Sequence, residues 1–248
     1  MISSELDASE PTHVAVRAGV RGSLTRERDI VTQRRPHAAT MRGMSDELVF
    51  YTHPMSRGRI ARWMLEEVGV PYRTEVVGYG APMRTPEYLA KNPMAKVPTL
   101  VRGDAVITEC AAICAWLADA YPDAGLAPSS PVDRASYFRW LFFGAGPVEA
   151  AVTNRSMGWE VPPDKRGRVG YGDFASVMDT LVFAVSRAPY LAGERFSAAD
   201  VYLGSQIGWG LQFGTMEKRP ELVAYWARIS SREAHARAKA MDDALMPK

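Results

Sequence analysis

The chain of 248 residues contains little cysteine and no long apolar run. Its two cysteines, Cys110 and Cys114, are four residues apart in a segment with helical periodicity, where side chains one turn apart are poorly placed for a bridge. We therefore expect no structural disulfide. No stretch approaches the roughly 18 apolar residues of a membrane helix, and the start lacks a signal-peptide pattern. We expect a soluble, cytoplasmic protein without membrane contact.

A large excess of charge of one sign is also missing. The chain has 30 Lys+Arg and 28 Asp+Glu, and the whole difference lies in residues 1–43, because residues 44–248 are balanced. Binding to nucleic acid or to an anionic membrane depends on an excess of positive charge. The composition therefore argues against a nucleic-acid partner. No cluster of potential ligands has the spacing of a metal site, so we expect no metal.

Residues 1–43 lack aromatic residues, lysine and any sustained apolar period. Such a composition predicts a disordered extension. Five acidic residues argue against a transit peptide, which is poor in acids. Methionines recur at Met41 and Met44, directly before the first β-prone run. Our hypothesis is that the natural start is one of these two residues and that the upstream stretch is a mis-called or dispensable extension.

Residues 44–122 mix short β-prone runs with helical periodicity. Strands are expected at 48–51, 72–77, 97–101 and 105–107, and helices at 60–68, near 85–90, and at 110–121. This order is a βαβ unit followed by a hairpin and a helix. A right-handed βαβ unit joined to a hairpin predicts a four-stranded mixed sheet.

The pattern changes after Pro122. Residues 123–132 are rich in proline and small residues and are expected to be a linker, whereas almost every segment of residues 133–248 has helical period. We therefore predict an α/β domain at 44–122 and an all-α domain at 133–248.

Four motifs occur in the order that is typical of one family: Tyr51-Thr-His-Pro-Met-Ser56, Lys96-Val-Pro-Thr-Leu100, Thr108-Glu-Cys-Ala-Ala-Ile113 and Gly193-Glu-Arg-Phe-Ser-Ala-Ala-Asp200. Together they make residues 48–245 resemble a cytosolic glutathione S-transferase of the bacterial, serine type. The resemblance implies a thioredoxin-like domain followed by a helical domain. It also implies glutathione as co-substrate, a small hydrophobic electrophile, a role in detoxification and a homodimer.

The resemblance also assigns residues that bind glutathione. Lys96 would meet the glycyl carboxylate, with Arg84 and Lys91 as looser candidates. Val97 would pair through its backbone with the cysteinyl unit, before a cis bond to Pro98. Glu109 would meet the ammonium group and the Cys110 N–H the γ-glutamyl carboxylate, because anions bind favourably at helix N-termini.

Cys110 departs from the pattern of the family, in which serine is usual. One interpretation is a small, half-buried replacement for serine, with glutathione binding weaker by the worth of one hydrogen bond, about 0.5–1.5 kcal/mol. The other interpretation is a redox thiol, since a helix N-terminus lowers the pKa of cysteine.

The catalytic group must favour the thiolate of glutathione, which is the nucleophilic form. Ser56, at the start of the first helix, is the preferred candidate, donating a hydrogen bond with help from the N–H groups of Arg57 and Gly58. Tyr51 ends the first strand, where tyrosine-type relatives place their phenol, and Arg57 could act by charge. His53 is expected to face solvent.

Two further motifs have structural and binding interpretations. Ser197 and Asp200 predict a capping box at a helix start, with Phe196 available for a hydrophobic staple. The electrophile pocket is expected between the domains, against a long helix that starts near Asp133. Its candidate wall residues are Tyr137, Trp140, Leu141 and Phe143, although aromatic residues at helical spacing are more often core.

The sequence thus predicts a glutathione transferase. Two alternatives stay open: a glutathione-dependent disulfide or peroxide reductase on the same site, and a non-catalytic binding module with this fold.

Overall fold

The computed structural model describes residues 47–246. The predicted extension 1–43 and the proposed starts at Met41 and Met44 lie outside this range. The elements of the first domain are β1 (Leu48–Thr52), α1 (Gly58–Val68), β2 (Tyr72–Val76), a 3₁₀ turn (Ala81–Arg84), α2 (Pro86–Leu89), β3 (Thr99–Arg102), β4 (Ala105–Ile107) and α3 (Cys110–Ala120). They follow the predicted order.

The four strands form one mixed sheet in the order β2-β1-β3-β4, with β1 parallel to β2 and antiparallel to β3. The predicted hairpin is present as β3 and β4. Side chains alternate between the faces of a strand. In β1, Phe50 and Thr52 are buried on the face that α1 covers, whereas Tyr51 lies on the other face, against Tyr88 of α2.

The second domain is helical throughout, as predicted. A 3₁₀ turn (Pro122–Ala124) precedes α4 (Pro131–Phe143), α5 (Glu149–Ser156), a 3₁₀ segment (Pro163–Arg168), α6 (Phe174–Ser186), α7 (Ala198–Phe213), α8 (Pro220–Ser230) and α9 (Glu233–Ala244). Helix α4 begins two residues before the expected boundary at 133. The reason is local: Ser130 caps the helix by accepting from the Asp133 N–H, and Pro131 occupies the first turn.

A π-helical turn, Gly144–Val148, joins α4 to α5 where the sequence has its Gly-Ala-Gly-Pro break. A Cβ atom at Gly144 would lie 3.0 Å from the Tyr202 ring, and the Gly144 carbonyl accepts a hydrogen bond from Gln206 Nε2 at 3.2 Å. The glycine therefore allows close approach of α7.

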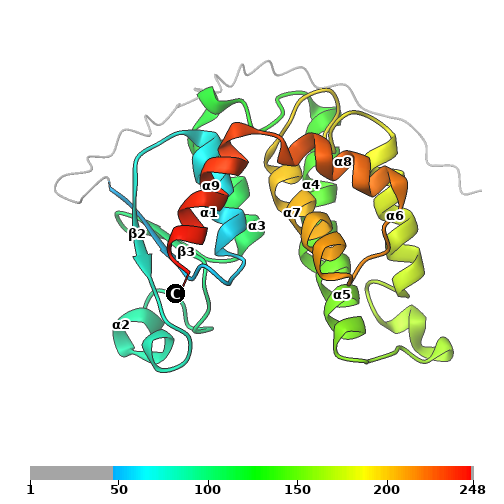
Figure 1. Cartoon of the computed structure of the whole chain (residues 1–248), viewed down its shortest axis with the longest axis horizontal. Helices are drawn as coiled ribbons and strands as arrows, with labels where there is room; N and C mark the ends of the chain where they lie inside the picture. Colours follow the sequence, from blue (N-terminus) through cyan, green and yellow to red (C-terminus); the bar gives the residue numbers. More distant parts are fainter. Residues whose placement is uncertain (1–46, 247–248) are drawn as a thin grey trace, which may run out of the picture. The chain divides into compact units, whose positions relative to one another are not determined.

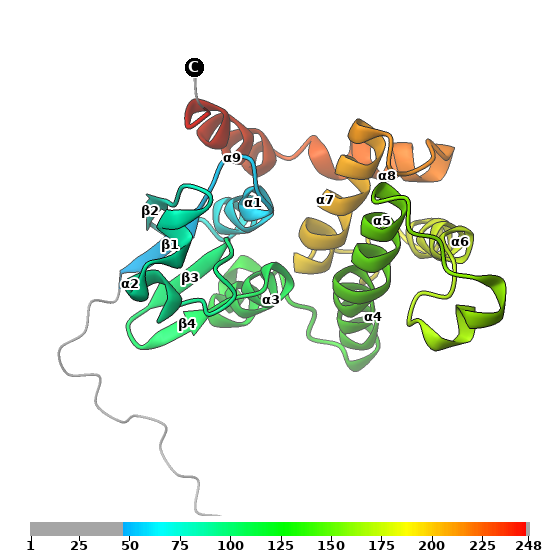
Figure 2. The ribbon, with the colours of Figure 1, turned by 90° about the horizontal axis from the view of Figure 1, so that it is seen from below.

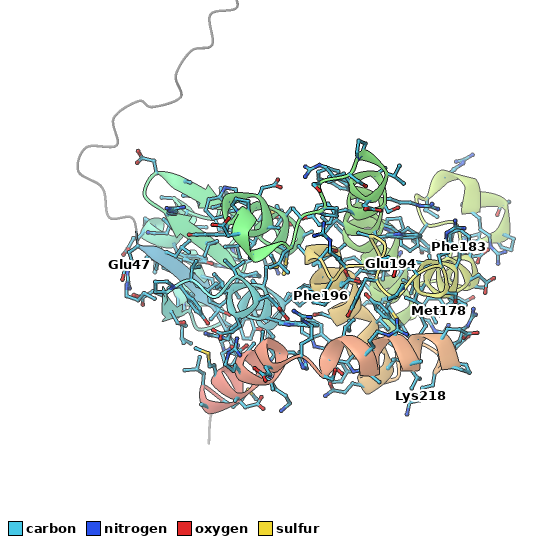
Figure 3. The ribbon with its side chains drawn as sticks, turned by 90° about the horizontal axis from the view of Figure 1, so that it is seen from above. Glu47, Met178, Phe183, Glu194, Phe196 and Lys218 are labelled. Carbon is cyan, nitrogen blue, oxygen red and sulfur yellow. The ribbon has the colours of Figure 1, made fainter. Side chains whose placement is uncertain are left out.

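Helix α7 is the centre of the core and packs against α1, α3, α4 and α8. The domains meet around Trp63 of α1, whose ring contacts Phe196 and Trp226. Figure 3 shows Phe196 where the helical domain approaches the first domain. The predicted capping box of Ser197 and Asp200 is present at the start of α7.

The C-terminal helix α9 leaves the helical domain and lies beside α1 (Figures 1 and 2). Its buried residues are Ala234, Ala238 and Asp242, spaced one turn apart. Four arginine–carboxylate pairs connect this C-terminal segment to α1. A helix 180 residues away along the chain thus becomes part of the first domain's surface.

Candidate functional site

A cleft of about 1250 Å³ opens at the loop between β1 and α1. One wall comes from the first domain, namely residues 54–57, the start of α1, residues 79–84 and residues 95–97. The opposite wall comes from the ends of α7 and α8 and from α9. Ser56, Arg57, Lys96 and Val97, four of the residues that the sequence analysis selected, therefore share one cavity.

Ser56 sits at the entrance of α1 and is half-buried. Its Oγ donates to the His53 carbonyl at 2.7 Å and accepts from the Gly58 N–H at 2.9 Å. A hydroxyl that already accepts one hydrogen bond is polarised as a donor. The Gly58 N–H, expected to assist at the sulfur, is engaged by Ser56 itself.

Gly58 is required by close approach at this point. A Cβ atom there would lie 1.9 Å from Thr52 Oγ1, so any side chain would displace the start of α1. Thr52 is buried, and its Oγ1 has no hydrogen-bond partner among residues 47–246. The strand end and the helix start are therefore in direct contact beneath Ser56.

Arg57 lies next to Ser56 and also lines the cleft. Its guanidinium pairs with the Glu149 carboxylate at the start of α5, through Nε at 3.3 Å and through a second nitrogen. The Arg57 side chain remains half exposed. The Arg57 guanidinium is thus held in an ion pair at the junction of the two domains, on the residue that follows Ser56.

Tyr51 is not brought together with these residues. Its ring packs edge-on against Tyr88 at 5.9 Å, and Lys91 Nζ lies 5.7 Å from the ring centroid. This is the α2 side of the sheet. His53 does not simply face solvent as expected: its ring is half-buried, packs against Tyr79 at 4.1 Å and accepts from the Met55 N–H.

The segment before β3 forms a second part of the cleft. The Val97–Pro98 bond is cis, as the resemblance implied. The Lys96 carbonyl accepts hydrogen bonds from Tyr88 Oη at 2.6 Å and Asn92 Nδ2 at 2.9 Å. The exposed Lys96 side chain therefore projects from a fixed backbone. Arg84 also lines the cleft, while Lys91 pairs with Glu87 on α2.

Glu109 and Cys110 begin α3. Glu109 is exposed, has a positive φ of 64° and is the N-cap residue of the helix. The first N–H groups of α3, including that of Cys110, are therefore free of helical partners, as at any helix start.

The Cys110 side chain turns inward from this helix start. Its Sγ donates to the Arg57 carbonyl at 3.5 Å, which connects α3 to the loop that carries Ser56. Cys110 and Cys114 are both buried free thiols, and burial raises the pKa of Cys114 well above its ordinary value. The burial of the Cys110 side chain is what a small replacement for serine would show, and that interpretation stays a prediction.

The structure places the four α4 residues that were expected at the electrophile pocket outside the cleft. Tyr137, Trp140 and Leu141 are buried in the core, Phe143 packs against Trp140, and none of the four lines the cleft. Their helical spacing reflects burial on two sides by neighbouring helices, which periodicity cannot distinguish from a pocket wall.

The apolar wall that the sequence analysis missed is at the ends of α7 and α8 and on α9. It consists of Trp209, Phe213, Trp226, His235 and Met246. The aromatic pair Trp209 and Phe213, four residues apart before Gly214, is the signal that could have indicated an exposed face at the end of α7. The contribution of α9 had no local signal.

His235 occupies the inner end of this wall. Its ring contacts Trp63 at 4.6 Å and Trp226 at 5.3 Å, and its Nδ1 lies 3.0 Å from the Ser230 carbonyl. Burial lowers its pKa below the ordinary value, with a smaller contribution from Lys239. Burial therefore favours the neutral imidazole.

Residues 47–246 contain no helix long and apolar enough to cross a membrane. In the same range, no three His, Cys, Asp or Glu side chains gather as they would around a metal ion.

Two family models match the chain. The model of the glutathione S-transferase N-terminal domain matches residues 55–120, and that of the C-terminal domain matches residues 176–233. The first covers the loop of Ser56 through α3. The second covers α6 to the start of α9.

Known proteins agree with these matches. The chain is 31% identical over 206 residues to glutathione S-transferase F10 of Arabidopsis thaliana, covering 75% of this chain and 94% of that protein. A theta class glutathione S-transferase from Xanthomonas axonopodis, solved with glutathione bound, has 30% identity and a TM-score of 0.62, with 78% and 97% of the two chains covered. A glutathione transferase from Methylococcus capsulatus has 27% identity and a TM-score of 0.65, with 79% and 99% covered.

Proposed function

The chain belongs to the glutathione S-transferase family and is a glutathione transferase, and on that premise we propose that the cleft beside Ser56 binds glutathione and activates its thiol. The observation that carries the assignment of the site is the Ser56 hydroxyl, half-buried at the start of α1 and lining the cleft. The bound thiolate then attacks a small hydrophobic electrophile.

Ser56 stabilises the thiolate by turning its O–H from the His53 carbonyl to the sulfur. The oxygen keeps the hydrogen bond from the Gly58 N–H during this rotation. A hydrogen bond to a charged group is worth about 1.5–3 kcal/mol, which corresponds to a thiol pKa lower by roughly one to two units. The N-terminus of α1 adds positive potential at the same place. Arg57 adds less, because its charge is offset by the Glu149 carboxylate.

The remaining groups of glutathione meet the residues around the cleft. Lys96 contacts the glycyl carboxylate, and the Val97 backbone pairs with the cysteinyl unit as an added strand would. The γ-glutamyl carboxylate binds at the N-terminus of α3 through the Cys110 N–H, and its ammonium group meets the exposed Glu109. These contacts orient the sulfur toward Ser56.

The electrophile occupies the wall formed by Trp209 and Phe213, opposite Met55 and Tyr79. Phe213, Met55 and Tyr79 are all exposed, so a hydrophobic ligand would remove apolar surface from water. The sulfur forms a new C–S bond, while the displaced group leaves with its electron pair or, in an addition, the new carbanion takes up a proton. A role in detoxification follows from this chemistry.

The two alternatives are less well supported. A glutathione-dependent disulfide or peroxide reductase would use the same site, but the relatives from Arabidopsis and Xanthomonas are glutathione S-transferases, which favours the transferase. A version that relies on a protein thiol is disfavoured further, because both cysteines are buried. A non-catalytic module would not need the Ser56 hydroxyl in the cleft.

We also propose that the enzyme is a cytoplasmic homodimer. Phe138 and Phe142, one turn apart on α4, expose 37% and 72% of their surface and supply an apolar strip for a second copy. Light scattering should give twice the 27.3 kDa of one chain. The mass of a single chain would contradict the dimer.

The assignment of Ser56 is tested with Ser56→Ala and Tyr51→Phe. With a generic aromatic electrophile, we expect Ser56→Ala to lower kcat/KM by about tenfold to a hundredfold, in line with the loss of one hydrogen bond to a charged group. Tyr51→Phe, on the other face of the sheet, should stay near the unmodified enzyme. Unchanged turnover in Ser56→Ala would contradict the assignment, and a large loss in Tyr51→Phe would favour the phenol.

A further inference from the structure

The backbone carbonyls of the loop that carries Ser56 accept hydrogen bonds from three side chains, those of Arg59, Tyr79 and Cys110. Within the loop, the Ser56 N–H and Oγ both donate to the His53 carbonyl. The Pro54 carbonyl accepts from Arg59 Nε at 2.5 Å, and the Met55 carbonyl accepts from Tyr79 Oη at 2.9 Å. Arg59 is therefore one of three residues whose side chains fix this backbone, and of the three it holds the Pro54 carbonyl.

Arg59 has a second partner on α9. Its terminal nitrogen donates to Asp243 Oδ1 at 2.8 Å while Nε remains on the Pro54 carbonyl. The guanidinium is a rigid plane with its donors in fixed directions. A displacement of Asp243 is consequently transmitted to the Pro54 carbonyl, two residues before Ser56.

The register of α9 determines where Asp243 lies. The buried stripe of α9 consists of two alanines and Asp242, so apolar burial provides little preference for one position along α1. Asp242 Oδ1 accepts from Arg62 Nε at 2.7 Å, and both side chains are buried. Because separating a buried pair costs several kcal/mol, this contact defines the register. Arg62 is one turn from Arg59, which places the adjacent Asp243 opposite Arg59.

Other pairs between the C-terminal segment and α1 do not reach the loop. Arg237 pairs with Glu66 at 3.1 Å, and Arg232 pairs with Glu67 at 2.7 Å, both toward the C-terminal end of α1. These two ion pairs also connect the C-terminal segment to α1, but they do not contact residues 53–57. They therefore supply a control for the general docking of α9.

We infer that Arg59 is a positioning residue for the glutathione thiol, and that the C-terminal helix, through Asp242 and Asp243, sets the geometry of the loop that carries Ser56. This inference rests on the proposed role of Ser56. Arg59 acts through the backbone of Pro54. A shift of the loop would move the Ser56 hydroxyl relative to the sulfur, and misplacement of a catalytic group by about 1 Å can cost up to a hundredfold in rate.

The test uses three variants of the full chain. Arg59→Lys keeps the charge but cannot hold Pro54 and Asp243 at once, and Asp243→Asn removes the negative charge on α9. Arg237→Gln is the matched control, because it breaks an α1–α9 pair away from the loop. The first measurement is hydrogen–deuterium exchange of residues 53–58 without glutathione. The second is the pH dependence of kcat/KM.

We expect Arg59→Lys and Asp243→Asn to increase exchange in residues 53–58 and to lower kcat/KM by about tenfold. The acid limb of the pH profile should move to higher pH, because a less well stabilised thiolate has a higher pKa. Arg237→Gln should match the unmodified chain in both measurements.

Three results would overturn the inference. Unchanged loop exchange in both loop variants would show that α9 does not act on the loop. Faster exchange with an unchanged pH profile would show that the contact does not position the thiol, and an equal effect of Arg237→Gln would assign the loss to general docking. Turnover by the unmodified chain distinguishes failure of this inference from failure of the proposed function. If the unmodified chain does not turn over glutathione but the variants still differ in exchange, the role of Ser56 is refuted and the coupling of α9 to the loop is established.

Discussion

Asp200 and Asp242 are both buried carboxylates of the helical domain, but they are stabilised in opposite ways. Asp200 is surrounded by neutral donors: Oδ1 accepts from the Leu191 N–H and Tyr225 Oη, and Oδ2 accepts from the N–H and hydroxyl of Ser197. No cation pairs with it among residues 47–246. Each oxygen has two hydrogen bonds, so the site has no spare capacity.

Asp242 instead depends on one cation. Oδ1 accepts from Arg62, while Oδ2 has no partner in the described part of the chain. Arg62 in turn donates to Tyr72 Oη and Thr74 Oγ1 and lies over the Phe50 ring at 5.2 Å. The Asp242 carboxylate is thus connected to strands β1 and β2 through that arginine.

Burial raises the pKa of both carboxyls, and in each case the hydrogen bonds oppose the increase. The difference is in what they join. Asp200 closes a local helix start, whereas Asp242 joins a C-terminal helix to α1. Asp200 therefore stabilises the core of the helical domain, whereas Asp242 attaches a helix that also lines the cleft.

The largest effect is expected from breaking the pair of Asp242. Arg62→Met leaves a buried carboxylate without its cation and should lower the free energy of unfolding by about 3–5 kcal/mol. Urea denaturation followed by circular dichroism measures this change. If the variant is as stable as the unmodified chain, Asp242 must be hydrated or protonated without loss of stability, and the pair with Arg62 does not stabilise the fold.

The double variant Arg62→Met/Asp242→Leu sharpens the comparison. Replacing both partners removes the unpaired charge, and most of the lost stability should return. The register of α9 would then depend on the peripheral pairs alone. A double variant no more stable than Arg62→Met would show that packing around the arginine, and not charge, provides the stability.

A smaller effect is expected at Asp200. Asp200→Asn keeps the shape of the side chain but replaces one acceptor oxygen by an amide N–H₂, which faces groups that are themselves donors. We expect the free energy of unfolding to fall by about 2 kcal/mol. Asp179→Asn, at an exposed carboxylate that pairs with Arg219, is the control and should change stability by less than about 0.5 kcal/mol. Equal effects of the two substitutions would refute the role given to the four donors.

Removing the cap itself should cost less again. Ser197→Ala retains the backbone N–H to Asp200 and loses only the hydroxyl, for an expected loss of about 1 kcal/mol. The control is Ser231→Ala, which removes an exposed hydroxyl at the end of α8. Thermal unfolding of the two variants is compared. A loss at Ser197 no larger than at Ser231 would remove the capping box from the account of stability.

The smallest expected effect is on the pH dependence of stability, and it concerns His235 of α9. Burial lowers the pKa of His235, with Lys239 lowering and Glu67 and the Ser230 carbonyl raising it. Near the ordinary histidine pKa of 6.5, His235 in the unfolded chain therefore binds a proton more readily than His235 in the folded chain. The free energy of unfolding consequently falls as the pH decreases through that region. His235→Phe should reduce this acid loss while keeping the contacts with Trp63 and Trp226. Identical pH dependence in both proteins would contradict it.

Local patterns were the part of the fold that could be predicted. The strand and helix order of the first domain follows from periodicity and turn residues, and the capping box of Ser197 and Asp200 is an interaction across three residues. The cis bond before Pro98 followed from the resemblance to the family. Tyr137 and Trp140 of α4 lie in the core and not in the cleft, because helical spacing is the same whether a neighbouring helix or a ligand covers such residues.

The sequence by itself determined the order of elements, the family and the presence of a serine at the start of α1, because each depends on residues close together in the chain. Only the tertiary structure decided which side chains meet. It turned Tyr51 away from Ser56, placed Arg57 on Glu149 and brought Asp242 and Asp243 to α1 across about 180 residues. Such contacts depend on how separate helices pack, and no local spacing encodes them.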